Sequence, residues 1–82
     1  MALKAVKRTI VGCDRDAGIV HDEFRIPDLF WHEVLSLVEA KDHDPGHLTS
    51  YELSTSQADR ILKLIGKMRY NALIYYLECE RG

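Results

Sequence analysis

The sequence predicts an α+β fold in which an N-terminal antiparallel β-hairpin packs on two α-helices, in the order ββαα. Three observations predict this fold. Stretches rich in β-branched residues surround a turn sequence in the first 26 positions, apolar residues recur at helical spacing after Pro27, and a second helical pattern begins at Ser54. A chain of 82 residues has room for one domain, so the range 1–82 is expected to fold as a single small domain.

The first 26 residues are expected to form the hairpin. Two stretches rich in β-branched residues, 3–11 and 19–26, flank a polar sequence that supplies the aspartates and the glycine that turns require. In the second stretch Asp22 interrupts an otherwise apolar face. A charged residue at such a position indicates an edge strand or a twisted end of the strand.

The first helix is expected to follow Pro27, which ends the second strand and can open a helix. Asp28 then lies at the positive end of the helix dipole. From Leu29 to Lys41 the apolar residues cover nearly half of the helix circumference. The helix should end before the Asp-His-Asp-Pro-Gly sequence at positions 42–46, because proline restricts the residue before it.

The second helix is expected to begin at Ser54, which forms a capping box with Gln57. Apolar residues then recur at helical spacing as far as Cys79. We therefore expect one long helix over residues 54–79.

Gly66 leaves a second interpretation of this segment open. A glycine inside a helix costs about 1 kcal/mol relative to alanine, so the long helix should bend there. Alternatively the helix ends near Met68, and a third strand follows over Ala72–Cys79, whose aromatic and β-branched residues permit it.

Charge is distributed unevenly along the chain, although the net charge is only −2. Residues 13–53 contain ten acidic and three basic residues, whereas the ends, 1–12 and 54–82, are mildly basic. This asymmetry favours self-association or a basic partner for the acidic segment, although ordinary solvated surfaces also produce it.

Cysteine content and hydropathy indicate a cytoplasmic protein. Cys13 and Cys79 could form at most one disulfide, and no secretory signal precedes them. No apolar run reaches the roughly 18–20 residues that a membrane span needs. We therefore expect reduced thiols and no membrane partner.

No catalytic motif stands out in the sequence. It has no glycine-rich phosphate loop, no Gly-x-Ser-x-Gly elbow and no His-Glu-x-x-His helix. Asp14 and Asp16 lie next to Cys13 and would disfavour its thiolate. We therefore expect neither enzyme activity nor a cofactor.

His43 and His47 are weak candidates for metal ligands, because imidazole and carboxylate groups suit zinc, nickel or non-haem iron. Pro45 and Gly46 break the helix that would align the two histidines. A polar turn at this position is the favoured interpretation, and no bound metal is expected.

Apolar residues on two sides of the segment 54–79 indicate that it is buried on both sides within the protein or that one side contacts a partner. Tyrosine and tryptophan dominate binding sites because they bury a large area and keep a polar group. The residues expected to form a contact surface are Leu64, Tyr70, Leu73, Ile74 and Leu77, with Trp31 and Leu35 beside them.

The function predicted from these patterns is protein–protein interaction without catalysis, in a regulator, adaptor or inhibitor. The open edge of the hairpin invites pairing with a second copy. A homodimer is therefore expected, and the partner is either another protein or the chain itself.

An alternative function is association with nucleic acid through two basic patches. One patch would lie on the first strand and the other on the last helix, where they would contact phosphates. The candidate residues are Lys4, Lys7 and Arg8 on the strand and Arg60, Lys63 and Lys67 on the helix. The net charge of −2 argues against this alternative.

Overall fold

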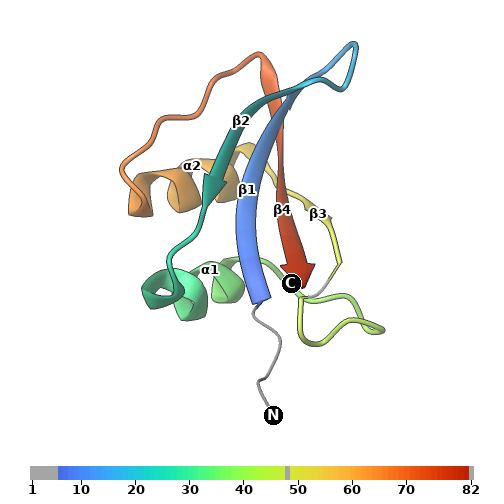
Figure 1. Ribbon diagram of the computed structural model, residues 1–82, viewed down its shortest axis with the longest axis vertical. Coiled ribbons are helices and arrows are strands. Elements are labelled where there is room, and N and C mark those ends of the chain that lie inside the picture. Colours follow the sequence, from blue (N-terminus) through green and yellow to red (C-terminus); the bar gives the residue numbers. More distant parts are fainter. Residues whose placement is uncertain (1–5, 48, 82) are drawn as a thin grey trace.

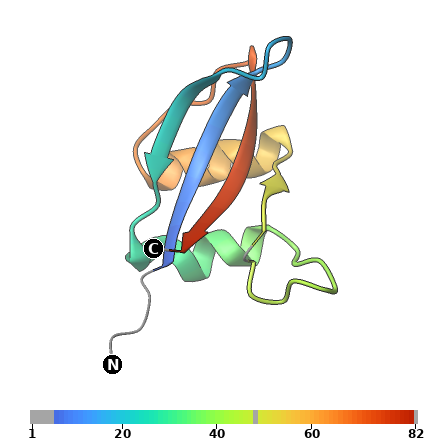
Figure 2. The ribbon, with the colours of Figure 1, turned by 45° about the vertical axis from the view of Figure 1, so that its right-hand side comes forward.

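The computed structural model describes residues 6–47 and 49–81, which form an antiparallel four-stranded sheet with helices on one face (Figures 1 and 2). In chain order the elements are β1 (Val6–Asp14), β2 (Val20–Arg25), the 3-10 turn η1 (Asp28–Phe30), α1 (Trp31–Leu37), β3 (Tyr51–Glu52), α2 (Thr55–Leu64) and β4 (Leu73–Arg81). The strand order in the sheet is β2-β1-β4-β3. The α+β prediction is confirmed, and so is the N-terminal hairpin.

The predicted order ββαα and the long second helix are wrong. Helix α2 ends at Leu64, and the segment Leu73–Arg81 is a strand that pairs with β1 along its whole length. The alternative of a C-terminal strand is therefore the correct one. That strand lies inside the sheet, and the two-residue strand β3 precedes it in the sequence.

Gly66 ends helix α2. Its φ of 75° lies in the left-handed region, which glycine adopts without steric cost. The Gly66 amide donates to Lys63 O at 3.1 Å, and the Lys67 amide donates to Leu62 O at 2.8 Å. These two bonds are those of a Schellman motif. The glycine therefore terminates the helix, whereas the sequence pattern treated it as an interior residue.

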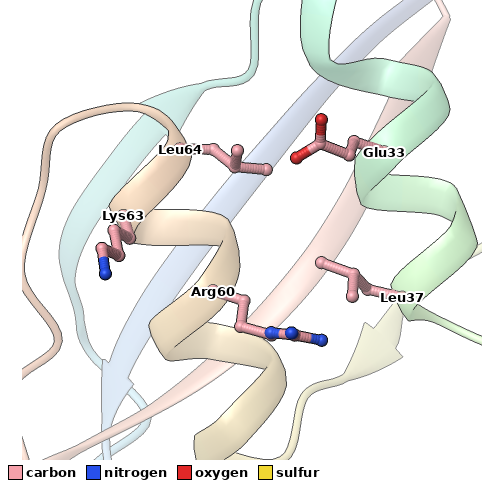
Figure 3. Close-up of a pocket in the computed structure, with 5 residues that line it drawn as sticks. All are labelled: Glu33, Leu37, Arg60, Lys63 and Leu64. Carbon is pink, nitrogen blue, oxygen red and sulfur yellow. The ribbon is translucent and has the colours of Figure 1, made fainter.

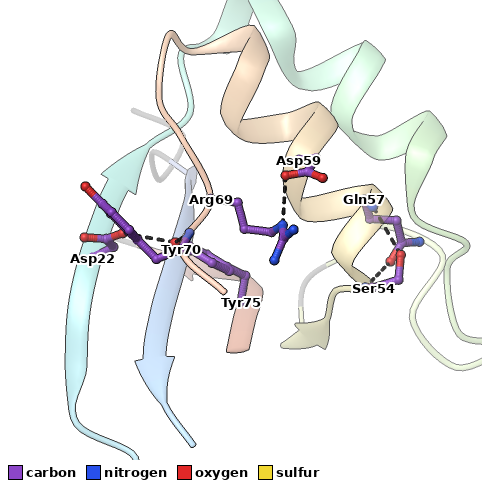
Figure 4. A network of polar contacts seen from close by, with 7 residues as sticks. All are labelled: Asp22, Ser54, Gln57, Asp59, Arg69, Tyr70 and Tyr75. Carbon is purple, nitrogen blue, oxygen red and sulfur yellow. Dashed lines mark hydrogen bonds and ion pairs between the residues drawn. The ribbon is translucent and has the colours of Figure 1, made fainter. Parts of the chain in front are cut away.

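The predicted capping box of α2 is confirmed (Figure 4). The Ser54 hydroxyl accepts the Gln57 amide at 3.1 Å, and Gln57 Oε1 accepts the Ser54 amide at 2.8 Å. Gln57 Nε2 also donates to Leu37 O at 2.9 Å. Gln57 therefore joins the start of α2 to the end of α1.

Helix α1 is shorter than expected. The segment after Pro27 forms η1 first, and α1 ends at Leu37 because Val38 is extended. The chain from there to β3 is organised around Asp44, a buried carboxylate. Its Oδ2 accepts hydrogen bonds from Thr49 N, Thr49 Oγ1 and the Tyr51 hydroxyl.

The core lies between the sheet and the two helices. The largest fully buried side chains are Ile10, Ile26, Val34, Ile61, Leu62 and Leu77. Tyr75 of β4 packs against Gly12 of β1, so closely that a Cβ at Gly12 would lie 2.7 Å from Tyr75 Cε2. Of the helices that the structure describes, none is long and apolar enough to cross a membrane.

Candidate functional site

Strand β2 forms one end of the sheet, where β1 is its hydrogen-bonded neighbour. The Ile26 amide donates to Arg8 O at 2.8 Å, so the backbone groups of Ile26 point toward β1. Because this direction alternates along a strand, the N–H and C=O groups of Glu23 and Arg25 point away from the sheet. No other strand in the described ranges pairs with them, so this edge is available to a further strand. The edge position that Asp22 indicated is confirmed.

The exposed apolar side chains of the molecule gather around this edge. Large hydrophobic residues that are 52–84% exposed, among those the structure describes, are Ile19, Val20, Leu29, Met68 and Tyr70. Ile19 and Val20 lie at the start of β2, and Leu29 follows its end. Together with Glu23 and Arg25 of β2, these five residues are called the edge surface below.

The hairpin turn holds Ile19 and Val20 at one end of the edge surface. Asp14 Oδ1 accepts the amides of Ala17 at 2.6 Å and Gly18 at 3.1 Å, and the Asp14 amide donates to Ile19 O at 3.0 Å. The hydrogen bond from Ala17 is the main reason that the pKa of Asp14 lies below its ordinary value. The ionised carboxylate therefore stabilises the turn.

The loop between α2 and β4 carries Met68 and Tyr70 to the same edge. The Tyr70 amide donates to the Tyr75 hydroxyl at 3.0 Å, and that hydroxyl donates to Asp22 Oδ2 of β2 at 3.1 Å (Figure 4). Burial raises the pKa of Tyr75, so its hydroxyl stays protonated and keeps its donor at neutral pH.

Two further contacts hold this loop. Lys67 Nζ lies 4.9 Å from the centre of the Phe24 ring in β2, and Arg69 Nε donates to Asp59 Oδ1 of α2 at 2.8 Å (Figure 4). Met68 lies between these two anchored residues. The loop is therefore fixed both to the edge strand and to the helix.

A hollow of about 390 Å³ lies between the hairpin and this loop. Its lining residues are Asp14, His21, Asp22, Tyr70, Ala72 and Leu73. His21 Nε2 lies 3.1 Å from Asp14 Oδ2. The walls of the hollow are largely apolar, and Asp14, His21 and Asp22 contribute its polar groups.

The predicted contact residues do not form one surface. Leu77 is 1% exposed and belongs to the core, so its assignment to a contact surface is corrected. Trp31 donates from Nε1 to Ile26 O at 2.9 Å and covers Arg8. Leu35, like Leu64 and Leu73, is partly buried against the core.

Two of the predicted contact residues keep a more accessible position. Tyr70 belongs to the edge surface, and Leu73 lines the hollow beside it. Ile74 is half-buried, and it points to the sheet face opposite Tyr75, because neighbouring residues in a strand alternate.

The basic residues of the nucleic-acid alternative are also separated. Lys4 lies outside the described residues. Arg8 is 7% exposed, its guanidinium carbon lies 4.5 Å from the centre of the Trp31 ring, and its Nη2 donates to Gly46 O at 3.0 Å. Because successive side chains in a strand point to opposite faces, Lys7 lies on the face of the sheet away from α2. The first strand therefore adds no basic patch to the helix.

Arg60 and Lys63 lie instead beside a groove between the two helices. Arg60 points toward α1, whereas the Lys63 side chain points away from it (Figure 3). The groove has a volume of about 440 Å³ and is also lined by Glu33, Leu37 and Leu64. It carries charges of both signs, which gives no preference for a phosphate backbone. Lys67 lies beyond the end of α2 and contacts Phe24.

The two histidines considered as metal ligands lie in different environments. His47 is buried, and its Nε2 is bonded to Val38 O, whereas His43 is exposed. Within residues 6–47 and 49–81, no group of three or more His, Cys, Asp or Glu side chains could hold a metal ion.

Sequence reasoning missed most of the edge surface. The sequence patterns assign Ile19 and Leu29 to the second strand and to the first helix, and Met68 to the apolar pattern of residues 54–79, so none of the three was expected on an exposed surface. Asp22, which marked an edge strand, was the available signal. It could not show that a loop about 45 residues later would bring Met68 and Tyr70 to the same strand.

Three comparisons with known proteins gave no match: no family model, no curated protein and no solved structure is significantly similar to this chain. The function is therefore inferred from its own residues.

Proposed function

We propose that this chain is a small cytoplasmic protein–protein interaction module that binds another protein chain at the edge surface. It acts by binding that chain, as a regulator, adaptor or inhibitor, and carries out no catalysis. The observation that supports this proposal is the gathering of the exposed large hydrophobic side chains around one open strand.

An open strand edge and exposed apolar residues are each unfavourable on a protein that works alone. A free edge invites uncontrolled pairing, and protein surfaces usually protect it with charges, bulges or a covering segment. Contiguous exposed apolar residues mark sites of association. Their occurrence along one strand edge supports binding of an extended segment, in which backbone hydrogen bonds give affinity and side-chain hollows give specificity.

The partner segment would add a strand beside β2. Its backbone would bond to the outward groups of Glu23 and Arg25, and its apolar side chains would cover Ile19, Val20 and Leu29. The hollow beside Tyr70 would take one further side chain.

The experiment that tests this proposal is affinity capture with matched surface variants, followed by titration calorimetry with the purified captured protein. The variants Ile19→Lys and Leu29→Lys place a charge in the edge surface. We expect each to weaken binding by about tenfold or more, which corresponds to roughly 1.4 kcal/mol.

Two variants serve as controls. Ser36→Lys adds the same charge on the exposed side of α1, and the pair Arg60→Glu with Lys63→Glu reverses the charge of the helix groove. Both controls should bind as tightly as the wild type. The proposal fails if the edge variants keep full affinity, or if the helix-groove pair alone abolishes binding.

A further inference from the structure

We infer that the chain pairs with a second copy of itself through β2, in an antiparallel register centred on Phe24, so that two sheets join into one. This inference rests on the proposed function, because it names the occupant of the edge surface. The directions of the backbone groups, the charges on β2 and the positions of the exposed apolar residues all favour this pairing.

The backbone directions restrict the register. In an antiparallel pair, residues that face each other must both point their N–H and C=O groups toward the partner, or both away from it. The groups of Glu23 and Arg25 point outward, whereas those of Phe24 point toward β1. The two-fold axis of such a dimer must therefore pass through a residue. An axis between two residues would pair a residue whose backbone groups point toward the partner with one whose groups point toward β1.

The charges select among the remaining registers. Centring on Glu23 places two Glu23 side chains opposite each other, and centring on Arg25 does the same with two arginines. Directly opposed like charges destabilise a strand pair. Centring on Phe24 instead places Glu23 opposite Arg25 of the second copy, twice by symmetry. Glu23 and Arg25 are also the residues whose backbone groups point toward the second copy, so each Glu23–Arg25 pair also exchanges two backbone hydrogen bonds.

The exposed apolar residues fit the same arrangement. Antiparallel pairing brings the start of β2 in one copy next to the end of β2 in the other. Ile19 and Val20 of one copy then lie near Leu29 of the second copy, and all three are among the most exposed hydrophobic residues described. Pro27, which has no N–H to donate, limits the paired region at each end.

The strand pairing also has a favourable geometry at its centre. Phe24 is half-buried and faces the helix side of the sheet together with Ile10, its partner across β1. At a position where the backbone groups point away from the new partner, opposed Cα atoms approach to about 4.5 Å. The two Phe24 rings would therefore be neighbours on the side that the helices occupy.

The interface is short, so we expect a reversible dimer with a dissociation constant on the order of 10 µM. Sedimentation velocity of the wild-type chain across a wide concentration range measures this equilibrium. Glu23→Arg places like charges opposite each other at both pairs, and so does Arg25→Glu. Each single variant should weaken the dimer by at least about tenfold.

The double variant Glu23→Arg with Arg25→Glu restores opposite charges at both pairs and should restore the dimer. Glu39→Arg makes the same charge change in an exposed residue after α1, outside the edge surface. This control should dimerise like the wild type. Amide hydrogen exchange adds a second readout, because the Glu23 and Arg25 amides should become protected only at concentrations where the dimer forms.

The outcomes separate this inference from the proposed function. A wild-type chain that stays monomeric at every concentration overturns the self-pairing, and capture of a different protein at the edge surface would still support the proposed function. A dimer that the single variants leave intact, or that the double variant fails to restore, uses another surface and overturns the register.

Discussion

Gly12 has no side chain, and the space that this leaves at the centre of the sheet is filled by the Tyr75 ring. The Tyr75 ring occupies the space that a Cβ at Gly12 would fill, at 2.7 Å. Tyr75 in turn links β2 to the α2–β4 loop through Asp22 and Tyr70. Packing at a single glycine therefore fixes part of the edge surface.

We predict that Gly12→Ala destabilises the protein by about 1–3 kcal/mol, because the added methyl group must displace a buried ring. Chemical denaturation measures the free energy of unfolding. The double variant Gly12→Ala with Tyr75→Leu should cost less than the sum of the two single variants, since the smaller side chain relieves the clash. Strict additivity would show that the ring is not the obstacle.

Asp14 gives the molecule a pH-dependent turn. Its pKa is lowered in the folded state, mainly by the hydrogen bond from Ala17. A carboxylate with a lowered folded pKa stabilises the fold above its unfolded pKa, and this contribution is lost as the pH falls through the folded pKa. We therefore expect the turn to loosen only in acid, below the ordinary pKa of aspartate.

An NMR titration of the Asp14 carboxyl carbon and of the Ala17 and Gly18 amides tests this expectation. All three signals should move together, with a midpoint below the ordinary value for aspartate. In Asp14→Asn the two amide signals should no longer follow this titration. A midpoint at or above the ordinary value would contradict the role assigned to the turn.

At the scale of elements, Gln57 connects the two helices. It completes the capping box with Ser54, and its amide nitrogen donates to the last residue of α1, Leu37. We predict that Gln57→Ala costs about 1–2 kcal/mol, because both connections are lost. Gln57→Glu keeps the acceptor for Ser54 but has no donor for Leu37 O, so its stability should lie between those of the wild type and Gln57→Ala.

Thermal and chemical unfolding of these two variants give the order of stabilities. Ser54→Ala, which removes only the N-cap acceptor, should cost about 1 kcal/mol and serves as the reference for the box alone. Equal stability of Gln57→Glu and the wild type would mean that the bond to α1 contributes nothing.

The elements that the sequence predicted correctly are those whose signals are local. The hairpin depends on a turn between two β-branched stretches, and the start of α2 depends on Ser54 and Gln57, three positions apart. The C-terminal strand was misread because it is apolar on both faces, with Tyr75 and Leu77 buried on one and Ile74 half-buried on the other. A central strand covered on two sides and a helix with two apolar sides produce the same composition.

The candidate site was less predictable than the fold, because its residues are brought together only by the tertiary structure. Nothing local in the sequence connects Leu29 with Met68 or Tyr70. Their common position follows from the long loop after Gly66, which returns to β2 through Lys67 and Tyr70. Strand β3, with two residues, is too short to leave a periodic signal.

At the scale of the whole molecule, the sheet has two kinds of boundary. At one end β3 pairs with only Tyr76 and Leu77 of β4, and the chain that leads into β3 is held by Asp44. At the other end the outward backbone groups of β2 have no strand neighbour among the described residues. The two ends of the sheet differ because the exposed large hydrophobic residues lie at the β2 end, so we expect association to proceed from that side.

The pairing of β1 with β4 also affects the folding of the chain. Val6 pairs with Arg81 and Asp14 pairs with Leu73, so the middle of the sheet joins nearly the first described residues to the last. Contacts between such distant positions slow folding relative to helical proteins of the same size, and stopped-flow refolding would measure the rate. During synthesis the hairpin and both helices leave the ribosome before β4, so the core that β4 completes can form only after that strand has been made.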